Sequence, residues 1–257
     1  MYFRAEDEND ISFCKGWGSS YQFATTDGKR IAASGNIQTL MKADGSRLDI
    51  SGKNYCYCFM FSECRSLTTA PALPATTLAD YCYTNMFYNC TSLTTAPAIL
   101  PATTLASECY SSMFSGCTSL TTAPALPAMT LASSCYNSMF NGCISLTTAP
   151  ATLPATTLAN YCYANMFYRC IALTTAPALI ATTLAEGCYS YMFQDCKKLA
   201  SMDVSFTTWN PTNATTNWVN GVGTEATGTK TFTCPSALPD TPRDASHIPS
   251  GWTKVDK

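Results

Sequence analysis

The repeated unit that decides the fold is spelled out by residues 78–97, Leu-Ala-Asp-Tyr-Cys-Tyr-Thr-Asn-Met-Phe-Tyr-Asn-Cys-Thr-Ser-Leu-Thr-Thr-Ala-Pro. Its Met-Phe pair recurs at steps of 26 or 27 residues, always with one Cys four residues before the Met and another four residues after it. Repeats with a fixed internal spacing predict a stack of similar units that bury a shared core. The pairs begin at Met60, Met86, Met113, Met139, Met166 and Met192.

Local chemistry divides each unit into two parts. Asp80, Ser107, Ser133 and Asn160 stand two residues before the first Cys, and their side chains are preferred helix N-caps. We therefore expect residues 81–88 and their equivalents to form two-turn helices. The Leu-Thr-Thr-Ala segment that follows favours a strand, because Thr is β-branched and the next Pro cannot continue a helix. The strands are predicted at 67–70, 93–96, 120–123, 146–149 and 173–176, stacked in one parallel ladder.

One unit buries too little apolar surface to offset the entropy of ordering it, so neighbouring units must share their faces. The sequence therefore predicts an α/β solenoid of strand, turn and short helix, with a cap at each end. Residues 1–50 form the predicted N-terminal cap, with a leading strand at 34–40, and residues 51–204 hold the repeats. Residues 205–257 form the predicted C-terminal cap, with a short helix at 214–219, strands at 230–234 and 252–255, and three Trp to cover the last unit.

Charge and composition exclude several classes of function. Only 12% of the residues are charged and the net charge is −2, so the chain offers no basic surface for nucleic acid. No apolar run is long enough to span a bilayer. His247, the single His, lies in the predicted cap, where the sequence places no nucleophile or acid beside it. We predict that the chain is not an enzyme and that it holds neither a cofactor nor a metal.

The fifteen Cys allow three interpretations. The repeat Cys are spaced eight residues apart, which does not match the closely paired ligands of zinc or iron–sulfur sites. Buried thiols that fill the core are favoured, because Cys behaves as a small apolar residue. A disulfide between units is the second interpretation, and a metal site is the third.

The motif Met-Phe-x-x-Cys-x-x-Leu-Thr-x-x-Pro resembles the leucine-rich repeats of BspA-like bacterial surface proteins, over about residues 48–204. The Leu-Pro-Ala-Thr-Thr-Leu-Ala variety is similar to hypothetical proteins of gut anaerobes and their prophages. The resemblance implies a right-handed solenoid on the cell surface, or a secreted one, that binds host proteins, other cells or glycans. The first residues lack the pattern of a secretory signal. We therefore interpret the sequence as that of a mature or truncated chain. A phage virion, such as a tail attachment protein, and a cytoplasmic scaffold or spacer are the alternatives.

Five tyrosines at predicted outward helix positions are the candidate ligand-binding residues. The equivalent positions of other units hold Glu, Ser, Asn, Gly or Gln, so the scaffold does not require Tyr there. Exposed Tyr stacks on sugar rings and fills protein–protein hot spots. The alternative is that they are scattered surface aromatics, and the Thr-rich strand face is a second possible surface. The candidates are Tyr81, Tyr88, Tyr161, Tyr168 and Tyr191.

Overall fold

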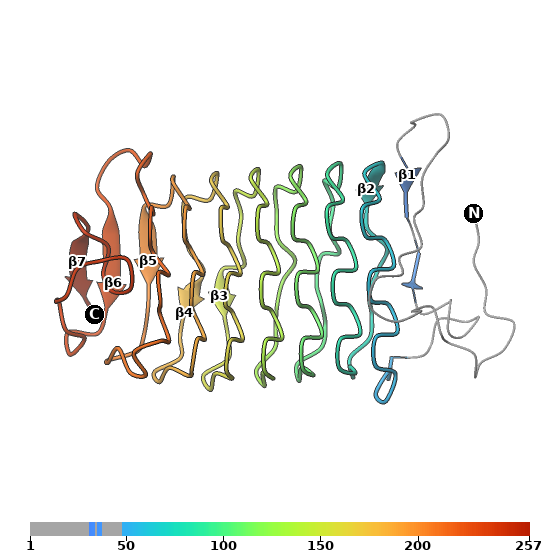
Figure 1. Cartoon of the computed structure of the whole chain (residues 1–257), viewed down its shortest axis with the longest axis horizontal. Coiled ribbons are helices and arrows are strands. Elements are labelled where there is room, and N and C mark those ends of the chain that lie inside the picture. The colour runs from blue at the N-terminus through green and yellow to red at the C-terminus, as the bar shows by residue number, and fades with distance from the viewer. Residues whose placement is uncertain (1–30, 34, 38–47) are drawn as a thin grey trace, which may run out of the picture.

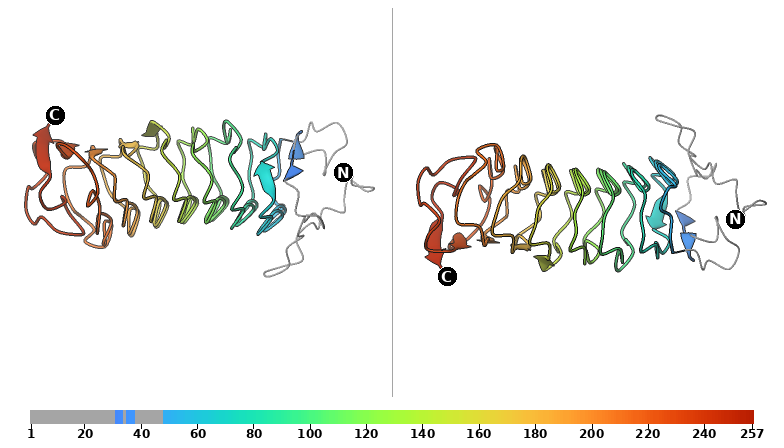
Figure 2. Two further views of the ribbon diagram at one scale, coloured as in Figure 1. Left: turned by 90° about the horizontal axis from the view of Figure 1, so that it is seen from above. Right: turned by 90° about the horizontal axis from the view of Figure 1, so that it is seen from below.

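The computed structural model describes residues 31–33, 35–37 and 48–257, and its repeats form an elongated stack of coils (Figure 1). Each coil lies against the coil before it and the coil after it, as two further views also show (Figure 2). We number the coils one to six by their Met-Phe pairs. Most of the predicted N-terminal cap, including most of the leading strand at 34–40, lies outside the described residues.

Regular strands are short and few. Among the described residues all strand pairings are parallel, in three separate sheets with the orders β1-β2, β3-β4 and β5-β6-β7. Between these sheets, neighbouring coils are joined by isolated parallel bridges such as Thr69 to Thr95 and Thr122 to Thr148. The pairing is thus parallel, but the single continuous ladder that we predicted is wrong. The strands are β1 Ile31–Ala32, β2 Leu67–Thr69, β3 Thr152–Leu153, β4 Ala178–Leu179, β5 Ser201–Asp203, β6 Thr231–Cys234 and β7 Thr253–Asp256.

The predicted helices are wrong, because the described residues contain no α-helix. Residues 79–90 and their equivalents instead form a chain of overlapping turns, which we call the turn wall. In coil two, alternate N–H groups close turns within the coil, as from Thr84 to the Tyr81 carbonyl at 3.2 Å. The N–H groups between them donate to the next coil, as from Tyr83 to the Cys109 carbonyl at 2.9 Å. The right-handed leucine-rich-repeat solenoid of strand, turn and helix is thereby corrected to a stack of turn-built coils.

Coil spacing explains why turns replace helices. Strands lie about 4.8 Å apart, whereas helix axes approach no closer than about 8 Å, so a coil containing both cannot stack evenly. The turn wall can keep the same spacing as the strands, because its backbone N–H groups donate directly to carbonyls of the next coil, as in a sheet. The N-cap residues that suggested helices occupy turn positions, where Asp and Ser are also favoured.

Left-handed backbone at every fourth residue breaks the helical path. Tyr81, Asn85 and Asn89 have φ angles of 58°, 54° and 55°, which belong to the third position of type II turns. The same three positions recur in every coil and form three columns. The first turn column holds Tyr55, Tyr81, Glu108, Ser134, Tyr161 and Gly187; the second holds Phe59, Asn85, Ser112, Ser138, Asn165 and Tyr191; the third holds Glu63, Asn89, Gly116, Gly142, Arg169 and Asp195.

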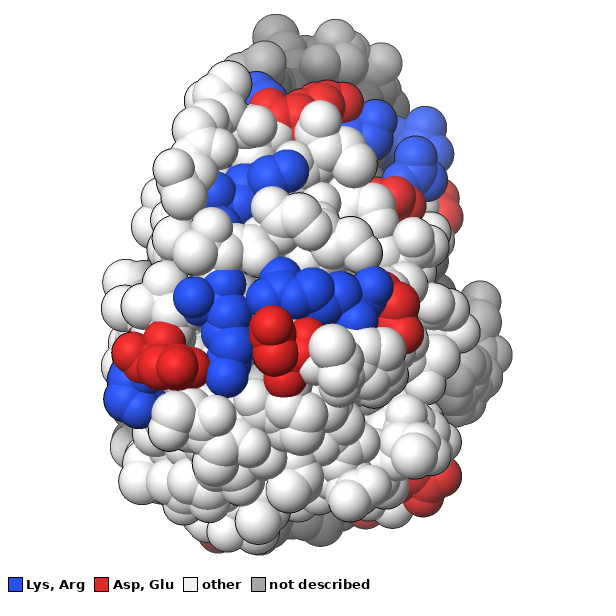
Figure 3. Space-filling model, turned by 90° about the vertical axis from the view of Figure 1, so that its left-hand side faces the viewer, with Lys and Arg blue, Asp and Glu red and all other residues white. Residues whose placement is uncertain are grey.

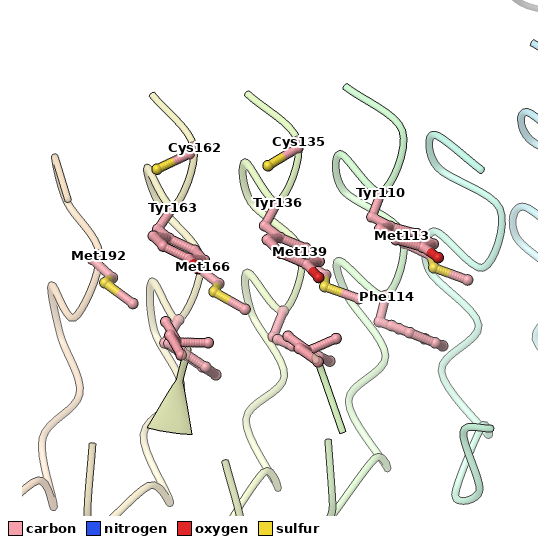
Figure 4. Packing of buried hydrophobic residues seen from close by; sticks show 14 of the residues in the cluster. Tyr110, Met113, Phe114, Cys135, Tyr136, Met139, Cys162, Tyr163, Met166 and Met192 are labelled. Atoms are coloured by element: carbon pink, nitrogen blue, oxygen red, sulfur yellow. The ribbon is translucent and has the colours of Figure 1, made fainter. Parts of the chain in front are cut away.

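The core consists of side-chain columns in register (Figure 4). Inward Tyr rings stack from Tyr57 to Tyr189 with centroids 5.4–5.9 Å apart, and a parallel column of Phe rings has spacings of 5.3–5.7 Å. Such offset stacking is a favoured aromatic geometry. Inward Leu from the other half of each coil join the same buried cluster.

The C-terminal segment closes the stack. Strands β6 and β7 extend the sheet that begins at β5, close to the strands predicted at 230–234 and 252–255. Trp218 is buried against the Tyr189 and Phe193 rings of the last coil, and Trp252 is buried in the same hydrophobic cluster. Residues 214–219 form turns rather than the predicted helix. The Tyr189 and Phe193 N–H groups of coil six donate to the Ala214 and Trp218 carbonyls, both at 2.8 Å, so this segment also pairs donors that the turn wall would otherwise leave open.

Candidate binding surface

The turn wall carries all five tyrosines that the sequence singled out, in two groups. Tyr81 and Tyr88 belong to coil two, whereas Tyr161 and Tyr168 belong to coil five and Tyr191 to coil six. Coils three and four separate the groups and hold Glu108 and Ser134 in the first turn column. The structure therefore does not bring the five rings into one site.

Tyr161 leans along the wall toward the next coil. Its hydroxyl donates to Glu186 Oε1 at 3.1 Å, and this hydrogen bond raises the pKa of the Tyr161 phenol. A Cβ on Gly187 would lie 2.2 Å from the Tyr161 ring, so Gly187 makes room for it. The side chain is still 40% exposed. Tyr161 therefore joins two coils and is also partly accessible to a ligand.

Tyr81 makes similar contacts in coil two. Its ring stacks on Tyr55 with centroids 4.7 Å apart and an angle of 11° between the planes. The negative charge of Glu108 in the next coil, together with a hydrogen bond to it, raises the pKa of the Tyr81 phenol. Tyr81 is half-buried, so its aromatic faces are partly used within the protein.

The other three tyrosines differ in exposure. Tyr191 is 37% exposed and has a φ of 56° in the second turn column. Tyr88 and Tyr168 lie one position before the third turn column and are half-buried, so they are less outward than a helical wheel predicts. Ile144 and Ile171, exposed on adjacent coils at the end of the turn wall, add apolar surface that the sequence argument missed.

Glu108, Glu186 and Gly187 are the further residues that the argument missed. Glu186 accepts hydrogen bonds from Asn160 and Asn213 at 3.4 Å as well as from Tyr161. The signal was present in the sequence: each Tyr of the first turn column in coils two and five is followed, one coil later, by an acid in or beside that column.

The repeat cysteines are buried, as predicted for core-filling thiols. The second Cys of a coil donates its S–H to the carbonyl of the Phe one coil earlier, as from Cys117 Sγ to Phe87 at 3.1 Å and from Cys143 Sγ to Phe114 at 3.1 Å. Burial raises the pKa of Cys143 to about 12. No three His, Cys, Asp or Glu side chains of the described residues are arranged to hold a metal ion.

His247 has the acidic neighbour that the sequence argument did not find. Its Nδ1 lies 2.8 Å from Asp244 Oδ1, and its ring packs edge-on against Trp209. Burial by itself raises the pKa of Asp244, but hydrogen bonds from His247 and from the Ser246 N–H lower it overall. Ser246 Oγ accepts the N–H of Asn217 at 2.9 Å. These contacts hold different parts of the C-terminal segment together.

Charge is concentrated at the ends of the molecule. Between residues 66 and 185 the charged side chains are Asp80, Glu108 and Arg169 alone. Lys, Arg, Asp and Glu gather on the C-terminal end (Figure 3), where ion pairs such as Lys197 with Glu225 at 3.2 Å use several of them. The body of the stack is therefore almost neutral, and its outward surface consists mainly of hydroxyl, amide and small apolar groups.

No family model, curated protein or solved structure matches this chain. None of the described residues form a helix long and apolar enough to cross a membrane.

Proposed function

We propose that the chain is a non-catalytic binding protein, displayed on a cell surface or secreted, that contacts a host or bacterial surface protein or a glycan through the turn wall. One observation carries the proposal. The inward columns of the wall repeat the same residues in every coil, while the outward columns vary and hold Tyr where other coils have Ser or Asn. The turn conformation is the same whichever of these residues a column holds, so the outward columns are available for recognition.

The near absence of charge supports a neutral ligand. Exposed Tyr rings and amide groups suit sugar faces and the apolar parts of proteins. Nucleic-acid binding depends mainly on Lys and Arg contacts to phosphates, and the wall carries Arg169 as its single cation in coils two to five. Contacts of modest strength on several coils would add through effective concentration, because one stacked core holds the coils together.

The test uses substitutions that the chain already tolerates in the same column. We would label the purified protein, find a ligand on arrays of glycans and of host and bacterial surface proteins, and measure its affinity. The fivefold variant is Tyr81→Ser, Tyr88→Asn, Tyr161→Ser, Tyr168→Asn and Tyr191→Asn. It should weaken binding at least tenfold with little change in melting temperature, since Ser134, Asn141 and Asn165 occupy equivalent positions.

A matched control replaces five exposed threonines on the other half of the coils by Ala, namely Thr95, Thr122, Thr148, Thr157 and Thr175. Unchanged affinity in the tyrosine variant, with loss in the threonine variant, would move the site to the Thr-rich half. A chain that captures nothing on either array would favour the alternative of a structural spacer, or of a phage-tail attachment protein with another target.

A further inference from the structure

The part of each coil that lies outside the turn wall forms a second repeated surface, which we call the Ala-Thr face. It comprises residues 68–77, 94–104, 121–130, 147–157 and 174–183, one segment from each of coils one to five. Each segment has a Thr pair at one end and a second Thr pair, or Met129-Thr130, at the other, with Ala and Pro between them. Most of its residues are therefore small, and the pattern repeats from coil to coil.

The Ala-Thr face contains no charged residue. None of its five segments holds Asp, Glu, Lys, Arg or His, although the chain has 32 Asp, Glu, Lys and Arg residues in all (15 + 17). Soluble proteins normally mix both signs of charge over their surfaces. Depletion of charge is instead typical of the centre of a protein–protein interface.

Apolar groups are exposed on this face. Ile99 is 48% exposed and Met129 is 56% exposed, and both belong to its segments. Ala98, Ala125 and Ala151 are exposed in successive coils. Their small side chains would let another surface approach the backbone closely. This combination favours a protein partner whose surface is also apolar and uncharged.

We propose that the Ala-Thr face is a homotypic interface that binds a second copy of this chain. The faces of two copies have the same coil spacing, so their repeats can stay in register along the whole length of the contact. Thr hydroxyls both donate and accept hydrogen bonds, so a Thr row is complementary to itself. Thr94 and Thr147 use their donors on the Thr68 and Thr121 carbonyls, at 3.1 and 3.2 Å, and can only accept. The donors across the interface would come from the other, exposed Thr of each pair, such as Thr95 and Thr148.

The size of the face is sufficient. Five coils at about 4.8 Å and about eight residues at ~3.3 Å give roughly 600 Å² on each copy. Pairing would then bury about 1,200 Å² in total, the lower end of the range for specific interfaces. A two-fold arrangement places the same patch on both copies. Both turn walls stay uncovered, so the dimer would present two binding surfaces if the proposed function holds.

The experiment measures mass by light scattering and sedimentation over a range of concentrations, from micromolar to sub-millimolar. The full chain should reach twice its monomer mass of 27.7 kDa. Ala125→Lys with Ala151→Lys places two like charges on adjacent coils at the centre of the face. This variant should remain at the monomer mass, with the circular dichroism spectrum and melting curve of a folded protein.

The matched control is Ile144→Lys with Ile171→Lys, which adds the same charge on adjacent coils at the edge of the turn wall, where Arg65 and Lys197 occupy the same column. It should remain a dimer. A full chain that stays monomeric throughout, or a face variant that still dimerises, would overturn the proposal. The proposal would also be overturned if the natural chain were monomeric and bound insoluble neutral glucan while the Ala125→Lys, Ala151→Lys variant did not bind it. The face would then be a polysaccharide site. The dimer mass is measured without any ligand of the turn wall. The test of the dimer is therefore independent of the ligand-affinity measurement on the tyrosine variant.

Discussion

Buried phenols and thiols set the properties of single residues in this protein. The Tyr110 and Tyr136 hydroxyls are buried and have no hydrogen-bond partner in the structure. Their rings are held by stacking on the Tyr of the coils before and after. A buried polar atom without a partner costs about 1–3 kcal/mol. The inward Tyr column therefore contributes through its rings and not through every hydroxyl.

Tyr136→Phe should consequently leave the free energy of unfolding unchanged or raise it by about 1 kcal/mol, because it removes an unpaired hydroxyl and keeps the stacked ring. Urea unfolding followed by fluorescence measures the change. Tyr161→Phe is the comparison, since its hydroxyl donates to Glu186 at the surface, where water can replace the partner, so its loss should change stability little. A clear destabilisation by Tyr136→Phe would show that the hydroxyl has a partner.

The thiols predict alkaline sensitivity. Burial raises the pKa of Cys135, Cys143 and Cys188 from 9.0 to about 12. Between these values the unfolded chain releases protons that the folded chain keeps, so stability is complete below pH 9 and falls as the pH rises toward 12. Each such thiol contributes a slope of about 1.4 kcal/mol per pH unit.

Urea midpoints measured at rising pH above 9 should therefore fall steeply. Cys143→Ala should be less stable at neutral pH, because it leaves a cavity, yet it should show a shallower alkaline decline. A variant whose decline is as steep as that of the natural sequence would contradict the assignment of this effect to Cys143.

At the scale of the element, the turn wall depends on which side chain each turn column carries. Side chains in these columns lean toward the next coil, where Gly often leaves space. A Cβ on Gly116 would lie 2.1 Å from Asn89 Oδ1, and one on Gly187 would lie 2.2 Å from the Tyr161 ring. Columns that look freely variable are thus coupled between neighbouring coils.

Gly187→Ala should destabilise the protein by about 1–3 kcal/mol, because it adds a strained left-handed Ala and displaces the Tyr161 ring. In a Tyr161→Ser background the steric part disappears and only the backbone strain remains. The cost of Gly187→Ala should then fall by at least about 0.5 kcal/mol, the size expected for residues in contact. Additive effects in this double-mutant cycle would show that the two residues are not coupled.

The sequence was sufficient to predict the repeat and the residues that face the core. The period follows from the recurring Met-Phe pairs, and the inward residues follow from the spacing of Cys82, Met86 and Cys90. It was insufficient for the elements. The same i, i+4, i+8 spacing fits a helix and a chain of turns whose pattern also repeats every four residues. Asn89 and Gly116 come directly after the predicted helices, where left-handed backbone would fit a helix end, but all three turn columns have left-handed backbone. The decisive term is the hydrogen bonding between coils, which a single unit does not reveal.

The candidate surface was predictable only in part. The position of all five tyrosines on one wall follows from the repeat, because equal places in the unit share a column. The contacts of Tyr81 with Glu108 and of Tyr161 with Glu186 could not be predicted from the repeat, since they depend on side chains one coil away. Half-burial of Tyr88 and Tyr168 follows from the turn geometry that replaced the helix.

At the scale of the whole molecule, the turn wall has a direction. In coil two, the N–H groups of Tyr81, Tyr83, Asn85, Phe87 and Asn89 all donate to coil three, and none in this set points backward. Every coil can therefore bond to the next in the same way, and length is set by the number of units and by the two ends. The C-terminal segment ends the series by offering carbonyls such as those of Ala214 and Trp218 to the N–H groups of coil six.

Removal of one complete period should then leave a shorter, folded molecule. Deletion of residues 118–143 joins Cys117 to Ile144, so every inward residue keeps its place and the wall still donates forward. We expect cooperative unfolding, a circular dichroism spectrum of the same shape, and a particle shorter by about 4.8 Å in solution scattering. Deletion of 118–130 alone is the control, because half a period turns Leu and Tyr of the later coils outward. That shorter deletion should give aggregated or unfolded protein, and a full-period deletion that behaves in the same way would show that the coils are not interchangeable.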